Sequence, residues 1–145
     1  MPGVRLLLGL EDQASAQSGG FKPQHIAITL WSYATLGRVP GDGLFRGLED
    51  RASAQVGGFN PQGIANILWA YATLGRMPGD GLLRALEDRA RSQVGVFKPQ
   101  DIANTLWAYA TLGRVPGDGL LRGLEDRASA QVGGCLLYTS DAADE

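Results

Sequence analysis

The sequence predicts an all-α fold, an α-solenoid of antiparallel helix pairs with about seven helices, and three observations support this class. The text repeats every 38 residues, and Phe21, Phe59 and Phe97 begin successive copies. Within each copy, apolar residues recur at intervals of three and four, which is the period of an amphipathic helix and not that of a strand. Proline begins and glycine ends the apolar stretches, as in helices. Neither helix of a unit can bury its apolar stripe alone, so the units must stack.

The first helix of each unit is expected over residues equivalent to 23–36. Its proline suits the first helical position, because the missing N–H would have no partner there. Gly37, Gly75 and Gly113 follow the last turn and are expected to adopt the left-handed conformation that ends helices. Asn60 is a good N-cap for the second copy.

The second helix is expected over residues equivalent to 44–56, after a turn at Pro40 and Gly41. Asp42 is the expected N-cap, and the glycines at 57–58 end the helix. Five of its apolar residues share one face. These residues are Leu44, Phe45, Leu48, Ala52 and Val56.

The chain divides into one partial repeat, three full repeats and a tail. Residues 1–20 align with the second half of a unit, and full repeats follow over 21–58, 59–96 and 97–134. We therefore interpret the chain as an internal piece of a longer array. The tail, 135–145, matches the translated end of a transposase-type sequencing adapter, so we expect it to be non-native and disordered.

The composition is that of a globular protein and argues against several functional classes. Basic and acidic residues nearly balance, at 13 and 15, and 44% of residues are hydrophobic. A single Cys excludes a disulfide framework and a cysteine-based zinc site, and no apolar run is long enough to span a membrane. With one His, no phosphate loop, no nucleophile elbow and no catalytic carboxylate pair, we expect no enzyme, cofactor or metal. The high number of glycines, 21, is explained by helix stops and turns that are copied with each repeat.

The three copies of the first helix differ at four positions, which lie on one stripe at offsets of zero, three, four and seven. Constant residues fill the opposite side, so we predict that this side packs in the core and that the changing stripe is free of packing. The stripe is either idle surface or a row of side chains that contact RNA bases. The candidates are His25, Gly63 and Asp101; Ile28, Asn66 and Asn104; Thr29, Ile67 and Thr105; Ser32, Ala70 and Ala108.

Other residues suggest secondary roles. The mid-helix Asn66 and Asn104 favour either an inter-helix hydrogen bond or a base-edge contact. The tryptophans of the first helices could stack on bases, but their neighbours favour the core. Basic residues near the helix ends either contact phosphates or cap helices. The phosphate candidates are Lys22, Arg38, Arg76, Lys98 and Arg114.

The stretch PQDIANTLWAYATLG, residues 99–113, resembles the octotricopeptide repeat family. The first copy departs from that motif at Ile28 and Ser32. The resemblance extends over residues 1–134 and implies a helical-repeat RNA-binding protein of chloroplasts or mitochondria, acting in transcript maturation, stability, splicing or translation. The matching residues are Gln100, Ile102, Ala103, Asn104, Leu106, Trp107, Ala108, Ala110, Leu112 and Gly113.

Two hypotheses of function follow. In the first, the array binds single-stranded RNA of an organellar transcript through its variable side chains and repeated arginines. In the second, it is a protein-interaction scaffold, which the near-neutral charge of each repeat favours, because dedicated nucleic-acid surfaces are usually more basic. Neither hypothesis involves a membrane, and other proteins are a further class of partner.

Overall fold

The computed structural model describes residues 21–143, with the backbone alone for 133–143. These residues form six α-helices and two short 3-10 turns, and they contain no strand. The predicted all-α solenoid is therefore confirmed. The expected second helix of the partial repeat, residues 1–20, lies outside the described residues. The elements are α2 (Pro23–Leu36), α3 (Asp42–Ala54), η2 (Val56–Gly58), α4 (Pro61–Leu74), α5 (Asp80–Ser92), η3 (Val94–Val96), α6 (Pro99–Leu112) and α7 (Asp118–Ala143).

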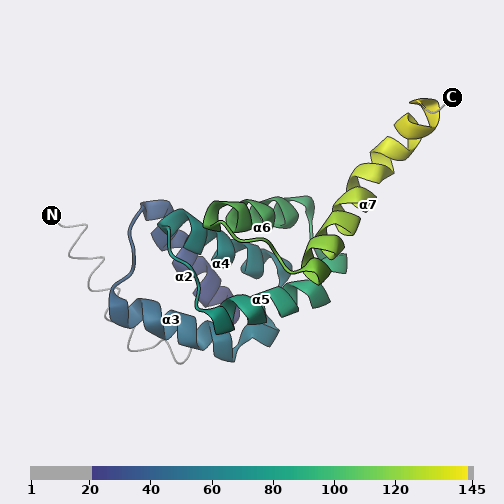
Figure 1. Ribbon diagram of the computed structural model, residues 1–145. Helices are drawn as coiled ribbons and strands as arrows, with labels where there is room; N and C mark the ends of the chain where they lie inside the picture. Colours follow the sequence, from purple (N-terminus) through teal and green to yellow (C-terminus); the bar gives the residue numbers. More distant parts are fainter. Residues whose placement is uncertain (1–20, 144–145) are drawn as a thin grey trace.

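The helices form two layers. The first helices of the repeats, α2, α4 and α6, pack directly side by side, whereas the second helices, α3, α5 and the start of α7, touch one another at few positions (Figure 1). Small side chains allow the close approach, since Ala27, Ala65 and Ala70 are all buried between first helices. The turns η2 and η3 lie against the second helix of the next repeat.

The first helices begin and end where the sequence predicts. Each carries proline in its first turn and is followed by a left-handed glycine, with φ of 71°, 70° and 74° at Gly37, Gly75 and Gly113. The closing hydrogen bonds are those of a Schellman motif, as when the Arg76 N–H donates to the Tyr71 carbonyl at 2.9 Å. Glycine is needed here because a Cβ disfavours positive φ.

The second helices begin two residues earlier than predicted. Gly41 is the N-cap of α3, and Asp42 is its first helical residue, so the prediction of Asp42 as N-cap is wrong. The carboxylate still lies in the first turn, where the helix dipole favours negative charge. At the other end α3 stops at Ala54, and η2 over Val56–Gly58 replaces the expected last turn.

The tail departs from the disorder expected for residues 135–145. The backbone of α7 continues without a break to Ala143, as Figure 1 shows. In the other repeats, a phenylalanine after the second helix enters the core, where Phe59 and Phe97 are 1% and 0% exposed, and a proline then starts the next helix. Cys135 replaces that phenylalanine and no proline follows, so neither device that redirects the chain is present.

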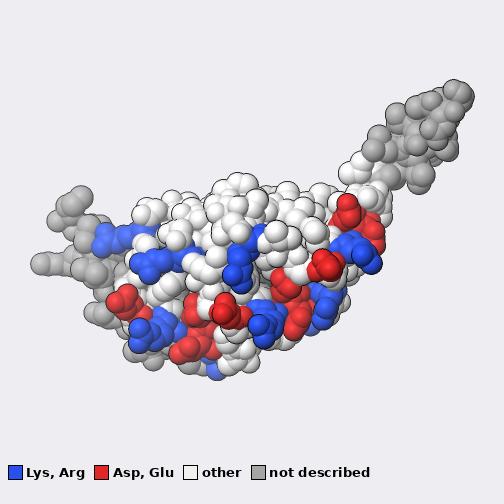
Figure 2. All heavy atoms as spheres, viewed as in Figure 1, with Lys and Arg blue, Asp and Glu red and all other residues white. Residues whose placement is uncertain are grey.

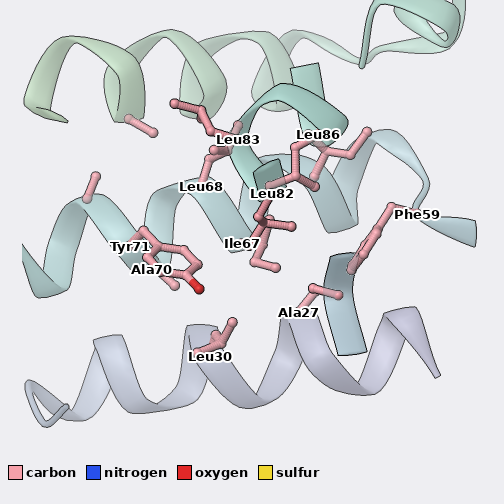
Figure 3. Packing of buried hydrophobic residues seen from close by; sticks show 14 of the residues in the cluster. Ala27, Leu30, Phe59, Ile67, Leu68, Ala70, Tyr71, Leu82, Leu83 and Leu86 are labelled. Carbon is pink, nitrogen blue, oxygen red and sulfur yellow. The ribbon is translucent and has the colours of Figure 1, made fainter. Parts of the chain in front are cut away.

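The core is a continuous apolar layer between the two sets of helices. Leucines of the second helices, such as Leu48, Leu86 and Leu124, are completely buried. They meet the inward side of the first helices, which includes Ile64 and Leu68 (Figure 3). Burying side chains of this size contributes about 1.5–3 kcal/mol each, which is how a short unit gains stability from its neighbours.

Two glycine substitutions should change stability in opposite directions. Gly75→Ala places a Cβ at φ of +70° and should lower the free energy of unfolding by about 1 kcal/mol. Gly81→Ala lies in α5 with open space around it and should raise the free energy of unfolding by about 0.5 kcal/mol. Urea unfolding followed by circular dichroism measures both. An unchanged or higher stability of Gly75→Ala would contradict the left-handed turn, and a loss in Gly81→Ala would contradict its open helical environment.

Candidate nucleic-acid interface

The tryptophans of the first helices form an exposed row, so the expectation that they lie in the core is wrong. Trp31 and Trp107 are 41% and 46% exposed, and Trp69 between them is half-buried. The ring centroids of Trp31 and Trp69 are 6.1 Å apart and those of Trp69 and Trp107 are 6.2 Å apart, with interplanar angles of 33° and 32°. We call these three side chains the tryptophan row.

The row is part of a regular exposed stripe along every first helix. Its four positions are spaced four, three and four residues apart, and each repeat presents the same sequence of residue types: a glutamine, a variable residue, the tryptophan and a threonine. Three of these positions are constant between copies, so they are not among the predicted variable positions. The signal in the sequence was that polar Gln and Thr share this face with Trp. The constant polar members are Gln24, Gln62 and Gln100, and Thr35, Thr73 and Thr111.

The predicted variable stripe is not a free surface. In the second repeat, Ile67 and Ala70 are 0% exposed and face Ala27 and Leu30 of α2 (Figure 3). Gly63 is buried on the same side of α4. These side chains pack against the preceding first helix, so they do not contact bases.

The same packing holds in the third repeat. Thr105 and Ala108 are 0% exposed, and the Thr105 hydroxyl has no hydrogen-bond partner. In the first repeat, Thr29 and Ser32 are half-buried and His25 is exposed, because no described first helix precedes α2. The prediction of base contacts is therefore wrong for Gly63, Ile67, Ala70, Thr105 and Ala108, which are buried against the preceding first helix.

Variation at one position of the stripe follows from helix capping. In α4, the Asn60 Oδ1 accepts the Gly63 N–H at 2.7 Å. The other two first helices have a lysine before the proline, and a later side chain accepts that lysine's N–H instead. The acceptors are His25 Nδ1 at 3.3 Å and Asp101 Oδ2 at 3.0 Å. A Cβ on Gly63 would lie 3.1 Å from the Asn60 Oδ1, so the glycine accompanies the asparagine.

The remaining variable position reaches the surface. Ile28 is 50% exposed, and Asn66 and Asn104 are half-buried. The two asparagines lie one turn before Trp69 and Trp107 on the exposed stripe. They line a pocket of about 360 Å³ between α4 and α6, which we call the amide pocket. The candidates Asp101 and Lys98 also line it, so the structure brings four predicted residues together.

The arginine candidates lie at the turns between first and second helices and are exposed. The Arg76 guanidinium lies over the Phe45 ring at 5.9 Å from its centroid, and an Arg114 nitrogen is 3.9 Å from an Asp80 oxygen. Arg38 and Lys22 are exposed as well. Figure 2 shows charges of both signs over the second helices and a largely uncharged surface over α4 and α6, with basic groups along the boundary.

The comparison with protein families decides the affiliation. Residues 46–132, more than half of the chain, match the model described as the Tbc2 translation factor, N-terminal domain. The chain belongs to this family. The match includes the whole second repeat and most of the third, and therefore Trp69, Trp107 and the amide pocket. No curated protein matches the chain.

In this Tbc2-family domain, a contact between glutamate and tyrosine holds successive repeats in place. The Tyr71 hydroxyl of α4 donates to Glu49 Oε1 of α3 at 2.7 Å, and the Tyr109 hydroxyl donates to Glu87 Oε1 at 2.9 Å. Burial raises the pKa of Tyr71 well above its usual value, and the hydrogen bond and negative charge of Glu49 raise that pKa further. Burial likewise raises the pKa of Tyr109, and the hydrogen bond and negative charge of Glu87 raise it further.

The same carboxylates explain a glycine in each turn. A Cβ on Gly79 would lie 2.9 Å from Glu49 Oε2, and a Cβ on Gly117 would collide with Glu87 Oε2. Each glutamate therefore joins the second helix of one repeat to both helices of the next. The hydrogen bonds thus connect a second helix to the first helix of the next repeat.

Another set of arginines has a structural role within each repeat. The Nε atoms of Arg51, Arg89 and Arg127 donate to the carbonyls of Phe21, Phe59 and Phe97 at 3.3, 2.9 and 3.0 Å. These arginines hold the start of the first helix against the second helix of the same repeat. Their guanidinium groups are therefore engaged with the backbone and are not a basic stripe for phosphates.

Tyr71→Phe should weaken the array in a pH-dependent way. Losing the hydrogen bond to Glu49 should lower the free energy of unfolding by about 2 kcal/mol near neutral pH. The raised pKa of Tyr71 stabilises the fold fully below about pH 10, where both states are protonated, and this benefit is lost as pH rises further because only the unfolded state releases the proton.

Urea unfolding of both proteins at about pH 8 and about pH 11 tests this. The stability of the native sequence should fall more between the two pH values than that of Tyr71→Phe. Equal losses in the two proteins would show that the Tyr71 hydroxyl does not carry the effect.

Thr105→Val separates packing from ligand contact. The hydroxyl is buried without a partner, so removing it should raise the free energy of unfolding by about 1 kcal/mol. RNA binding, measured by fluorescence anisotropy, should not change. A less stable variant with weakened binding would restore Thr105 as a base-contact residue.

Proposed function

We propose that this Tbc2-family domain binds single-stranded RNA along the exposed stripe of its first helices and has no catalytic activity of its own. The tryptophan row is the observation that carries the proposal. Large aromatic side chains are normally buried. A row of them on the surface exposes apolar area to water, which is unfavourable unless a flat apolar partner covers it. Unpaired bases are such partners, since they stack on aromatic side chains in single-strand binding proteins.

The geometry of the row suits successive bases. The three rings are spaced regularly, at 6.1 and 6.2 Å between centroids, and Trp31 and Trp107 are 41% and 46% exposed. A base that stacks on an aromatic side chain contributes about 1–3 kcal/mol. Three repeats can therefore hold a short strand weakly, and a longer array adds such contacts repeat by repeat.

The electrostatics point to a binding mode in which stacking outweighs charge. The exposed stripe itself is uncharged, and the basic residues Arg38, Arg76 and Arg114 directly follow the glycines that end the first helices. They can reach the phosphates of a strand that follows the row. With few phosphate contacts, affinity should fall with salt, but less steeply than for a strongly basic protein.

The family affiliation supports a role in translation. The matching domain is named for a translation factor, and the octotricopeptide resemblance adds organellar transcripts as the target. We infer that the full protein acts on the maturation, stability or translation of a transcript in a chloroplast or mitochondrion. In the described residues no helix is long and apolar enough to cross a membrane, and no cluster of side chains suits a metal ion.

A protein-binding scaffold remains the second candidate function. The mixed charges of the second helices (Figure 2) and the structural use of Arg51, Arg89 and Arg127 favour it. A protein partner would use the charged second-helix side or an apolar part of the first-helix side. The two functions differ in whether RNA quenches tryptophan fluorescence, because only stacking places bases on the row.

Trp107→Ala should weaken RNA binding about tenfold, because it removes one stacking surface. Fluorescence anisotropy with labelled single-stranded RNA at low salt measures the affinity. Quenching of tryptophan emission reports contact with the row. Val115→Ala is the matched control, since it also shortens an exposed apolar side chain, 80% exposed, away from the stripe.

Binding that is equal for Trp107→Ala and the native sequence would contradict the proposal. So would the absence of any binding to single-stranded RNA, and in that case the scaffold function is the one to pursue. Affinity that does not change between low and high salt would also count against RNA, because phosphate contacts release counterions.

A further inference from the structure

The amide pocket opens on the exposed stripe beside the tryptophan row. It lies between α4 and α6 and measures about 360 Å³, within the usual range for small-molecule sites. Most of the residues that line it are polar, although surfaces between packed helices are usually apolar. The polar lining comes from Gln62 and Asn66 of α4 and from Lys98, Gln100, Asp101 and Asn104 at the start of α6.

The amides suit the edge of a base. An Asn or Gln side chain offers an acceptor and a donor side by side, and this pair matches a base that has an amino group next to a ring nitrogen. The edges of unpaired bases in single-stranded RNA are free to form such bonds. Asn66 and Asn104 lie one turn from Trp69 and Trp107, so a base stacked on the row presents its edge toward the pocket.

Asp101 adds a preference among bases. Its carboxylate is 8% exposed and one oxygen accepts the Lys98 N–H at 3.0 Å, which fixes it at the pocket wall. A carboxylate only accepts hydrogen bonds, so it attracts the amino group of cytosine or adenine and repels the carbonyl oxygen that uracil has in place of the cytosine amino group. The Lys98 ammonium is on a long exposed side chain and can reach a phosphate instead.

The other junction between first helices lacks this set of groups. Its counterparts of Asn66 and Asp101 are Ile28 and Gly63, which offer neither an amide nor a carboxylate. The difference between the two junctions is therefore one of chemistry on a common backbone.

On the basis of the proposed RNA binding, we propose that the amide pocket selects cytosine or adenine, whose Watson–Crick edge has an amino group next to an accepting ring nitrogen, over uracil. The base is held across two repeats, by amides of α4 and α6 together, and not by one helix alone. The junction between α2 and α4 contributes stacking without this selection.

Cytosine and uracil homopolymers of equal length give the sharpest test, because the two bases stack over similar areas and differ in the amino or carbonyl group at the edge. The domain should bind oligo(rC) about tenfold more tightly than oligo(rU) in anisotropy titrations. An oligo(rA) arm distinguishes the two amino-bearing bases.

Asp101→Asn should bring the ratio of oligo(rC) to oligo(rU) affinity close to one. The amide oxygen can still accept the Lys98 N–H, so the helix start is kept, and thermal melting by circular dichroism checks this. Asn104→Ala should lower oligo(rC) affinity with little change for oligo(rU). Ile28→Asn adds an amide opposite Asn66 and should raise oligo(rC) affinity, while Val115→Ala should leave all affinities unchanged.

Equal binding of oligo(rC) and oligo(rU) by the native domain would overturn the selection and leave RNA binding intact. A preference for oligo(rC) that persists in both folded Asp101→Asn and folded Asn104→Ala would overturn the assignment to this pocket. Failure to bind any homopolymer would overturn the proposed function and this inference together.

Discussion

Close packing of the first helices through small side chains is the constraint on which the rest of the structure depends. Alanine at the contact positions lets α2, α4 and α6 lie directly side by side. A helix packed on both flanks and on its inner side has only one narrow stripe left for solvent. Tryptophan is too large for the tight flanks, so it is found on that stripe. The tryptophan row is in this sense a result of how closely the backbones approach.

The glutamate–tyrosine contact gives this packing a fixed register. Glu49 and Glu87 each receive a hydroxyl from the next repeat and occupy space that a glycine leaves open. Apolar surfaces alone would allow neighbouring repeats to slide, since burial is not directional. A buried hydrogen bond to a charged acceptor is directional and costly to leave unmade.

The sequence was sufficient for the fold because helix period, proline starts and glycine stops are local signals, repeated in each copy. It was insufficient for the candidate site because orientation between helices is not local. Ile67 and Ala70 vary between copies, and this looked like freedom from packing. In fact both are fully buried against the preceding first helix (Figure 3). Trp107 looked like a core residue from its neighbours in sequence, yet a shift of one position around a helix moves a side chain by about 100°. Asn66, Asn104 and Asp101 are predicted site residues, but their meeting in one pocket depends on two different repeats.

The capping arrangements at the starts of the first helices bear on how such arrays diverge. Asn60 with Gly63 and Lys98 with Asp101 are two complete solutions to the same problem, and a hybrid of them either crowds the asparagine oxygen or leaves an N–H without an acceptor. A change from one capping arrangement to the other therefore requires two residues to change together. Copying whole units avoids the unfavourable intermediate, so duplication is an easier route to new repeats than gradual substitution. The near identity of the copies agrees with such a history.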